Sequence, residues 1–415
     1  MKAIRLKWFL VFLLASAVLQ LPAQQSEADR NRFEEIKAKA EKGDAEAQYN
    51  LGECYYDGKG VPKDAAEAAK WYRKSAEKKY APGQNALGVC YDQGEGVAKD
   101  AVEAVKWYRK AAEQGNAKAQ YNLGHCYYDG EGVPEDAVEA ANWCRKAAEQ
   151  GFAMAQYGLA NCYHQGKGVA KDSVEAANWC RKAAEQGFAM AQYGLGFCYA
   201  NGDGVPNDAV ETVKWYRKAA EQGFILAQCN LGACYKNGEG VTKDMVEAVK
   251  WFRKAAEQGD GKAQYNLGNC YHMGEGVAKD AVEAVKWYRK AAEHGDAGAQ
   301  NGLGVCYCNG EGVAQDYAEA VGFYQKAAAQ NNADAQYNLG LCCAKGLAVA
   351  QDYVESYKWT SLAAAQGNES AKKTLPFIKL EMTSEQIAEA QRLVREFKPR
   401  MALDSGIRTT QDISR

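Results

Sequence analysis

A 36-residue period runs through this chain and constrains its fold more than any other feature. Tryptophans keep this step, as at Trp71 and Trp107; Phe323 takes one of the places and Trp359 resumes the series. Nine ungapped copies therefore cover residues 45–368, and such a period predicts an array of stacked repeats. The period is marked most regularly by Cys54, Cys90, Cys126, Cys162, Cys198, Cys234, Cys270, Cys306 and Cys342.

Each copy reads as two helices joined by a short turn. In the third copy, residues 117–129 place Leu123 and Cys126 on one face at helical spacing. Gly130 and Gly132 follow, and glycines there suit the positive φ that ends a helix. The pattern predicts a helix A, a Gly-x-Gly-Val turn and a helix B in every copy.

An aspartate opens helix B in all nine copies, from Asp64 to Asp352. A glutamate follows three residues later each time, from Glu67 to Glu355. This spacing is a variant of the capping box, in which each N-cap contributes about 1 kcal/mol. We therefore interpret these carboxylates as helix caps rather than as acid–base catalysts.

The two ends of the array are predicted to be capping helices. One hairpin cannot bury its own apolar face, so neighbouring copies must supply the missing part of the core. Residues 24–44 align with a helix B that has Glu35 in place of the tryptophan, which gives a polar outer face. Residues 369–400 supply the C-terminal caps, where Pro376 disturbs the first helix and a Thr383 capping box opens the second. Residues 401–415 form a flexible tail.

The first 23 residues differ from the rest of the chain. Three basic residues precede an apolar run from Trp8 to Leu19, which is short for a bilayer span. Pro22-Ala23 then leads into polar sequence. This order predicts a secretory signal peptide over residues 1–23 and hence a periplasmic or secreted protein.

Composition excludes several function classes. Without the three basic residues of the leader, 48 lysines and arginines face 53 acidic residues, and no basic surface for nucleic acid is visible. No later stretch is apolar enough to span a membrane.

The motifs exclude further kinds of site. The Gly-x-Gly turn follows a helix rather than a strand, so it is not a nucleotide-binding loop. The four histidines are scattered over three copies and no Cys-x-x-Cys occurs, so we expect neither a metal nor a cofactor.

The cysteines allow two interpretations. The nine cysteines of the period share the apolar face of helix A, and helices pack about 8–10 Å apart, beyond disulfide reach; we expect them to be buried thiols. Cys144 and Cys180 replace a helix B tyrosine and give an even step of 18 with Cys126 and Cys162. A bridge Cys126–Cys144 with Cys162–Cys180, or a bridge Cys144–Cys162, remains open.

The copies resemble the Sel-one-like repeat family, relatives of the tetratricopeptide repeat. The sixth copy carries the motif as "LGACYKNGEGVTKDMVEAVKWFRKAAEQG", residues 231–259. The resemblance implies an all-α, right-handed α-solenoid of nine helix-turn-helix repeats that serves as a scaffold for protein–protein contacts, without catalytic residues. It also implies an alternative, a β-lactam- or peptidoglycan-fragment-binding protein with weak β-lactamase activity.

The varied positions of helix A predict where a protein or an extended peptide binds. In the first copy these are residues 46, 50, 53 and 57, and nine such stripes would form a concave wall of about 90 Å at about 10 Å per copy. Copies four to six carry apolar side chains there and at the preceding turns, which favours an interaction surface. The oligomeric state is not predicted. The candidate binding residues are Phe152, Met154, Phe188, Met190, Phe197, Phe224, Leu226, His125 and Asn161.

Overall fold

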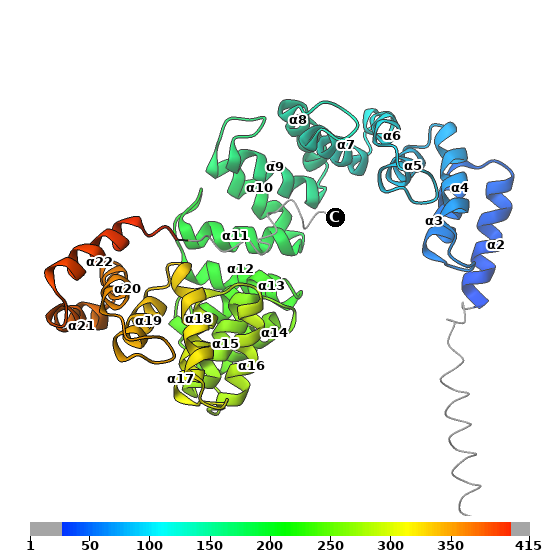
Figure 1. The fold of residues 1–415 in the computed structure, drawn as a ribbon. Helices are drawn as coiled ribbons and strands as arrows, with labels where there is room; N and C mark the ends of the chain where they lie inside the picture. Colours follow the sequence, from blue (N-terminus) through cyan, green and yellow to red (C-terminus); the bar gives the residue numbers. More distant parts are fainter. Residues whose placement is uncertain (1–26, 400–415) are drawn as a thin grey trace, which may run out of the picture. The chain divides into compact units, whose positions relative to one another are not determined.

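The computed structural model describes residues 27–399, and every regular element in that range is an α-helix (Figure 1). The predicted leader, residues 1–23, and the predicted tail, residues 401–415, lie outside the described residues. Nine helix pairs follow one another, and within residues 27–188 and within residues 189–380 each helix packs on the next in the chain, which confirms an all-α solenoid. None of the described helices is long and apolar enough to cross a membrane.

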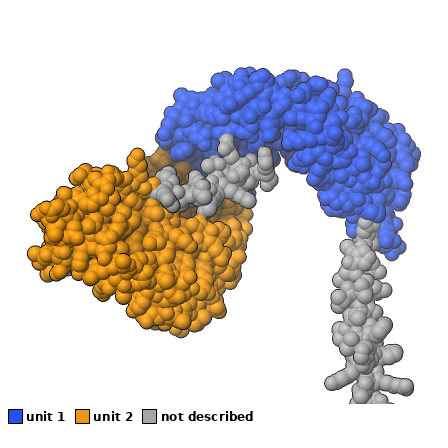
Figure 2. All heavy atoms as spheres, viewed as in Figure 1, with its two compact units in different colours: residues 1–188 blue, residues 189–415 orange. Residues whose placement is uncertain are grey.

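The chain forms two compact units, divided after Phe188 (Figure 2). Within the described residues, the first unit contains α2 (Glu27–Glu41), α3 (Ala45–Asp57), α4 (Ala65–Glu77), α5 (Ala81–Gln93), α6 (Ala101–Glu113), α7 (Ala117–Asp129), α8 (Ala137–Glu149), α9 (Ala153–Gln165) and α10 (Ser173–Glu185). The second contains α11 (Ala189–Asn201), α12 (Ala209–Glu221), α13 (Ile225–Asn237), α14 (Met245–Glu257), α15 (Gly261–Met273), α16 (Ala281–Glu293), α17 (Ala297–Asn309), α18 (Tyr317–Ala329), α19 (Ala333–Lys345), α20 (Tyr353–Ala365), α21 (Glu369–Leu380) and α22 (Ser384–Glu396). Odd numbers from α3 to α19 are helix A and even numbers from α4 to α20 are helix B.

The core of each copy lies between its two helices. Leu51 on α3 is fully buried, and Tyr72 on α4 is 3% exposed. The two helices approach closely because Gly52 has no side chain: a Cβ there would lie 2.5 Å from the Tyr72 ring. The Leu-Gly pair of helix A and the tyrosine of helix B therefore form one packing unit.

The Gly-x-Gly-Val turn makes the contact between consecutive copies. Gly132, in the third copy, has φ +69° and sits on the first turn of α6 in the second copy. A Cβ at Gly132 would overlap the carbonyl oxygen of Ala101. The same overlap recurs at the second turn glycine of other copies, so this position requires glycine for space as well as for φ. In the ninth copy Ala348 occupies the position with φ 55°.

A buried glutamine on helix A also connects the copies, and the sequence interpretation missed it. Gln120 on α7 is 5% exposed, and its Nε2 donates to the carbonyl oxygen of Ala112 on the preceding α6 at 3.1 Å. Its Oε1 accepts from Nε2 of Gln150, at the end of α8, at 2.7 Å. One amide thus bonds to two helix B ends, and a glutamine recurs at this helix A position in all nine copies.

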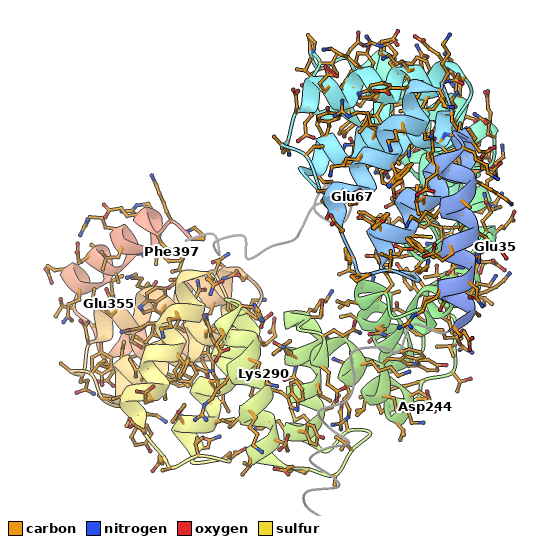
Figure 3. The ribbon with its side chains drawn as sticks, turned by 90° about the vertical axis from the view of Figure 1, so that its right-hand side faces the viewer. Glu35, Glu67, Asp244, Lys290, Glu355 and Phe397 are labelled. Atoms are coloured by element: carbon orange, nitrogen blue, oxygen red, sulfur yellow. The ribbon has the colours of Figure 1, made fainter. Side chains whose placement is uncertain are left out.

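The aspartates at helix B act as N-caps, as predicted, but the predicted capping box is wrong. Asp244 accepts hydrogen bonds from the backbone N–H groups of Val246 and Glu247. Glu247 pairs with Lys250 at 2.5 Å instead of bonding back to the cap. The backbone N–H of Asp244 donates to the carbonyl oxygen of Tyr235 at 2.9 Å, so it is not available to Glu247; Figure 3 labels the equivalent Glu67 and Glu355, which also pair with lysines.

Capping helices occupy both ends of the described chain. On α2, Phe33 and Ala40 are buried while Glu35 is exposed, so this helix covers the first copy with a polar outer face (Figure 3). At the C-terminal end α22 begins with the predicted capping box of Thr383 and Gln386. Pro376 lies inside α21, which nevertheless continues to Leu380.

The turn contact predicts unequal costs for two glycine substitutions in the first unit. Gly115→Ala meets no atom within 4 Å and forces only a positive φ of 87°, so it should cost about 1–2 kcal/mol. Gly132→Ala adds the overlap with the Ala101 carbonyl and should cost at least about twice as much. Urea unfolding followed by circular dichroism measures both. Equal costs would contradict a steric role for the second turn glycine.

The glutamine contact makes a second prediction. Gln150→Ala removes the donor to the buried Oε1 of Gln120 and should cost about 1–2 kcal/mol of unfolding free energy. Lys78 occupies the equivalent position in the first copy, where Oε1 of Gln48 has no partner among the described residues. Lys78→Ala is therefore the matched control and should cost less than about 0.5 kcal/mol. A similar cost for both variants would show that the Gln120–Gln150 hydrogen bond contributes little.

Candidate functional site

The varied positions of helix A lie outside the core throughout the described repeats. We call the residues aligned with 46, 50, 53 and 57 of the first copy the helix A stripe. None of these positions is buried in any of the nine copies. Half-buried members such as Ala233 and Val305 pack against the edge of the core, but residue type at these positions differs between copies while the helix pairs stay the same.

The predicted binding residues on the stripe differ in exposure. In the first unit Met154 is 39% exposed. His125 and Asn161 are half-buried, and Nδ1 of His125 lies 3.1 Å from a carboxylate oxygen of Asp129 on the same helix. In the second unit Phe197 is 45% and Leu226 is 41% exposed, whereas Met190 is half-buried.

The three phenylalanines at the turns pack differently from the residues of the stripe. Phe152, Phe188 and Phe224 immediately precede α9, α11 and α13 and are half-buried. Their rings contact those of Tyr121, Tyr157 and Tyr193, with centroids 5.6, 5.7 and 5.2 Å apart. At α9 and α13 the phenylalanine replaces a capping side chain and makes no capping hydrogen bond. Each ring therefore extends the core of its unit, whereas Met154, Phe197 and Leu226 on the stripe remain exposed.

A depression of about 530 Å³ in the first unit includes one of these phenylalanines. Amides are prominent in it, and Asn85 Oδ1 accepts from Nδ2 of Asn122 at 3.0 Å. Amides, aromatic rings and one lysine offer hydrogen bonds and apolar contact to a polypeptide. Its lining residues are Tyr49, Pro82, Asn85, Asn116, Ala117, Lys118, Gln150, Gly151 and Phe152.

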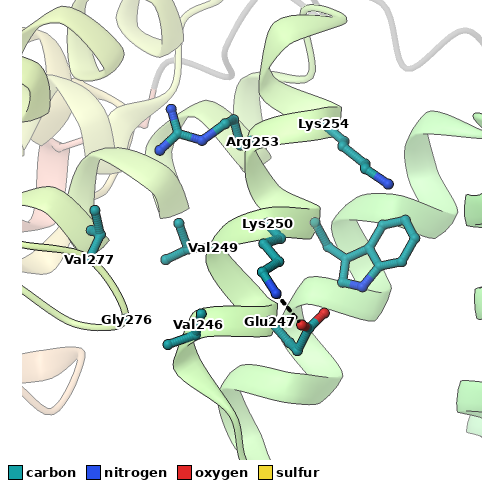
Figure 4. Close-up of a pocket in the computed structure, with 9 residues that line it drawn as sticks. Val246, Glu247, Val249, Lys250, Arg253, Lys254, Gly276 and Val277 are labelled. Atoms are coloured by element: carbon teal, nitrogen blue, oxygen red, sulfur yellow. Dashed lines mark hydrogen bonds and ion pairs between the residues drawn. The ribbon is translucent and has the colours of Figure 1, made fainter.

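A second depression, of about 460 Å³, lies on helix B in the second unit (Figure 4). Val246 and Val277 line it together with the Glu247–Lys250 ion pair. Lys254 places its Nζ 4.2 Å from the ring centroid of Trp251. The Trp-x-x-Lys spacing recurs in the first seven copies. Because these contacts recur with the repeat, we assign this surface to stability rather than to a ligand.

The repeat signature identifies the family. The Sel1 repeat profile matches nine consecutive segments that together cover residues 45–368, with the boundaries predicted from the period. The chain belongs to the Sel1 repeat family. Sel1 repeat proteins typically mediate protein–protein interactions, and no curated protein matches this chain.

Two solved structures support this assignment. A protective antigen present in uropathogenic Escherichia coli strains, which displays an SLR fold, is 33% identical with a TM-score of 0.55. The match covers 91% of this chain and 97% of the antigen. A Sel1 repeat protein from Oxalobacter formigenes is 34% identical with a TM-score of 0.55, and the match covers 74% of this chain and 89% of that protein.

The cysteines of these Sel1 repeats are reduced thiols in the structure, including Cys126, Cys144, Cys162 and Cys180. All of the chain's cysteines lie in the described range, and twelve are buried whereas Cys198 and Cys308 are half-buried. Burial raises the pKa of Cys126 and of Cys144 to about 12, which makes both thiols poor nucleophiles at neutral pH. Among residues 27–399 no cluster of three ligating side chains could hold a metal ion.

Thiol chemistry tests both interpretations of the cysteines. In the native protein at pH 8, alkylation by iodoacetamide should modify the half-buried Cys308 at least about tenfold faster than the buried Cys144. In denaturant without reductant, titration should count all 14 thiols. A count below 14 would show that a bridge such as Cys126–Cys144 forms, and comparable native rates at the two sites would contradict the burial of Cys144.

Proposed function

We propose that this chain is an exported, non-enzymatic adaptor that binds a partner protein or an extended peptide through its helix A stripe. The supporting observation is the exposure of three large apolar side chains on the stripe of the fourth to sixth copies, Met154, Phe197 and Leu226. Exposed large apolar side chains carry a hydration cost in the free protein, which a bound partner removes. The predicted leader supports export to the periplasm or beyond.

The packing of the phenylalanines narrows the proposed surface. Phe188 contacts Tyr157 within the first unit, so its substitution should affect folding as well as binding. Phe197 and Leu226 lie in the second unit, are more exposed, and can be replaced with little effect on packing. We therefore assign the partner contacts to the exposed stripe residues and a structural role to the three turn phenylalanines.

The β-lactam alternative has no comparable support. The half-buried and exposed stripe offers amides and apolar side chains, and the buried thiols have raised pKa values. No observation in residues 27–399 favours a β-lactam site over a polypeptide site. This alternative stays a prediction, for which turnover of a chromogenic β-lactam is the direct assay.

Site-specific photo-crosslinking tests the proposed function. A benzophenone amino acid placed at Phe197 or Leu226 of the full chain should yield one discrete crosslinked species in envelope extract from the source cells. Val210 is the matched control position, because it is 65% exposed but lies on helix B of the same unit. Crosslinks of equal yield and identity at Val210 would contradict a role for the stripe, as would a lack of crosslinks at both stripe positions.

A further inference from the structure

The stripe of the second unit is almost free of charge over four consecutive copies. In copies five to eight it comprises sixteen positions, of which six are asparagine, three are glycine, six are apolar and one, Lys262, is charged. A quarter of all residues in the chain are charged, so an average surface of sixteen positions would carry at least four charges. Charged residues return in the ninth copy, at Asp334 and Lys345.

This deficit is a property of one face and not of the second unit as a whole. Helix B of the fifth copy, α12, exposes Lys214, Arg217 and Lys218 to solvent. On the stripe the exposed side chains are apolar instead: Phe197 is 45% and Met273 is 66% exposed. In the fifth copy the ionic groups of the helix pair therefore lie on helix B, and the stripe of copies five to eight carries Lys262 as its one charged residue.

Hydrogen bonds hold several amides of the stripe in place. Asn269 accepts the Tyr288 hydroxyl through Oδ1 at 2.7 Å, and Nδ2 of Asn230 lies 3.4 Å from the Tyr193 hydroxyl. The first bond uses the amide oxygen of Asn269, whose Nδ2 can still donate. The second uses the amide nitrogen of Asn230, whose Oδ1 can still accept. Fixed amides of this kind can bond to the N–H and C=O groups of an extended backbone, which has many of both.

From this arrangement we infer that the stripe of copies five to eight binds an extended polypeptide segment that carries few or no charged side chains. Over most of the stripe a charged side chain would lose hydration against amides and apolar groups without gaining a counter-ion. Charged groups occur on or beside the stripe at a few places. Lys262 lies on it, and Lys236 hydrogen-bonds Asn266 at 3.5 Å. Glu239 and Glu311, in the adjoining turns, accept hydrogen bonds from Asn237 and Asn309 at 3.0 and 3.1 Å.

The dimensions set the length of this segment. Four copies at about 10 Å each span about 40 Å. An extended strand rises about 3.3 Å per residue, so the matching segment has about 12 residues. Phe197 and Leu226, on α11 and α13, would contact apolar side chains at one end, and Met273 on α15 would contact one further along.

A random dodecapeptide display library panned on the full chain tests this inference, which rests on the proposed function. Peptides recovered should contain at least about threefold fewer charged residues than the input library. Their binding, measured by fluorescence anisotropy, should weaken at least about tenfold in the double variant Phe197→Asp and Leu226→Asp. Val210→Asp places the same charge on an exposed site of helix B and should leave binding unchanged.

The opposite outcomes distinguish this inference from the proposed function. Peptides as charged as the input that still require Phe197 and Leu226 would overturn the inference while leaving a peptide-binding stripe in place. Peptides unaffected by the double variant, or no recovery of peptides at all, would contradict both. A dimer in sedimentation that Phe197→Asp abolishes would assign the stripe to a second copy of the chain and would also overturn the inference.

Discussion

The contact of one turn with the backbone of the preceding copy is the constraint on which the repeats depend. At Gly132 there is room for a hydrogen but not for a methyl group beside the Ala101 carbonyl. Because backbone atoms make this contact, it is the same whatever side chains the two copies carry elsewhere. The buried Gln120, bonded to two helix B ends, adds a directional polar contact at the same joint. Copies can then vary on helix A while their spacing within each unit stays constant.

Many titratable groups of the described residues take part in structural contacts. Carboxylates cap helix B or pair with lysines there, as Asp244 and Glu247 do, and Lys254 lies over Trp251. Thiols such as Cys126 are buried, with pKa values raised by loss of hydration. The stripe of copies five to eight consists instead mainly of amides, glycines and apolar side chains, which recognise a partner by complementarity.

The sequence predicts the features that follow from periodicity. It does not predict those that depend on a hydrogen bond between helices or on the rotamer of one side chain. The helix boundaries, the buried Leu51 and the end caps follow from spacing. The Glu247 interaction was mispredicted because the backbone N–H of the Asp244 cap donates to the carbonyl oxygen of Tyr235 on helix A, and Glu247 pairs with Lys250 instead. Gln120 was missed because glutamine usually lies on the surface, although its recurrence in every copy was a visible signal. The sequence alone could not show that the turn phenylalanines pack inward while Met154 is exposed. The direction of a side chain at an N-cap depends on its rotamer, and residue spacing does not determine the contact of the Phe152 ring with Tyr121.

The fourth copy shows how local these constraints are. Here Ala160 replaces the helix A glycine that elsewhere leaves room for a helix B tyrosine, as Gly52 does for Tyr72. At the tyrosine position of the same copy stands Cys180, a much smaller side chain, and both residues are buried. The smaller Cys180 leaves room for the added methyl group, so both changes are accommodated within one helix pair, although the methyl group is much smaller than the lost ring. Cys180 therefore has a packing role that requires no disulfide. Because such a change is compensated inside its own copy, neighbouring copies need not change, and the stripe of each copy can be altered independently of the rest.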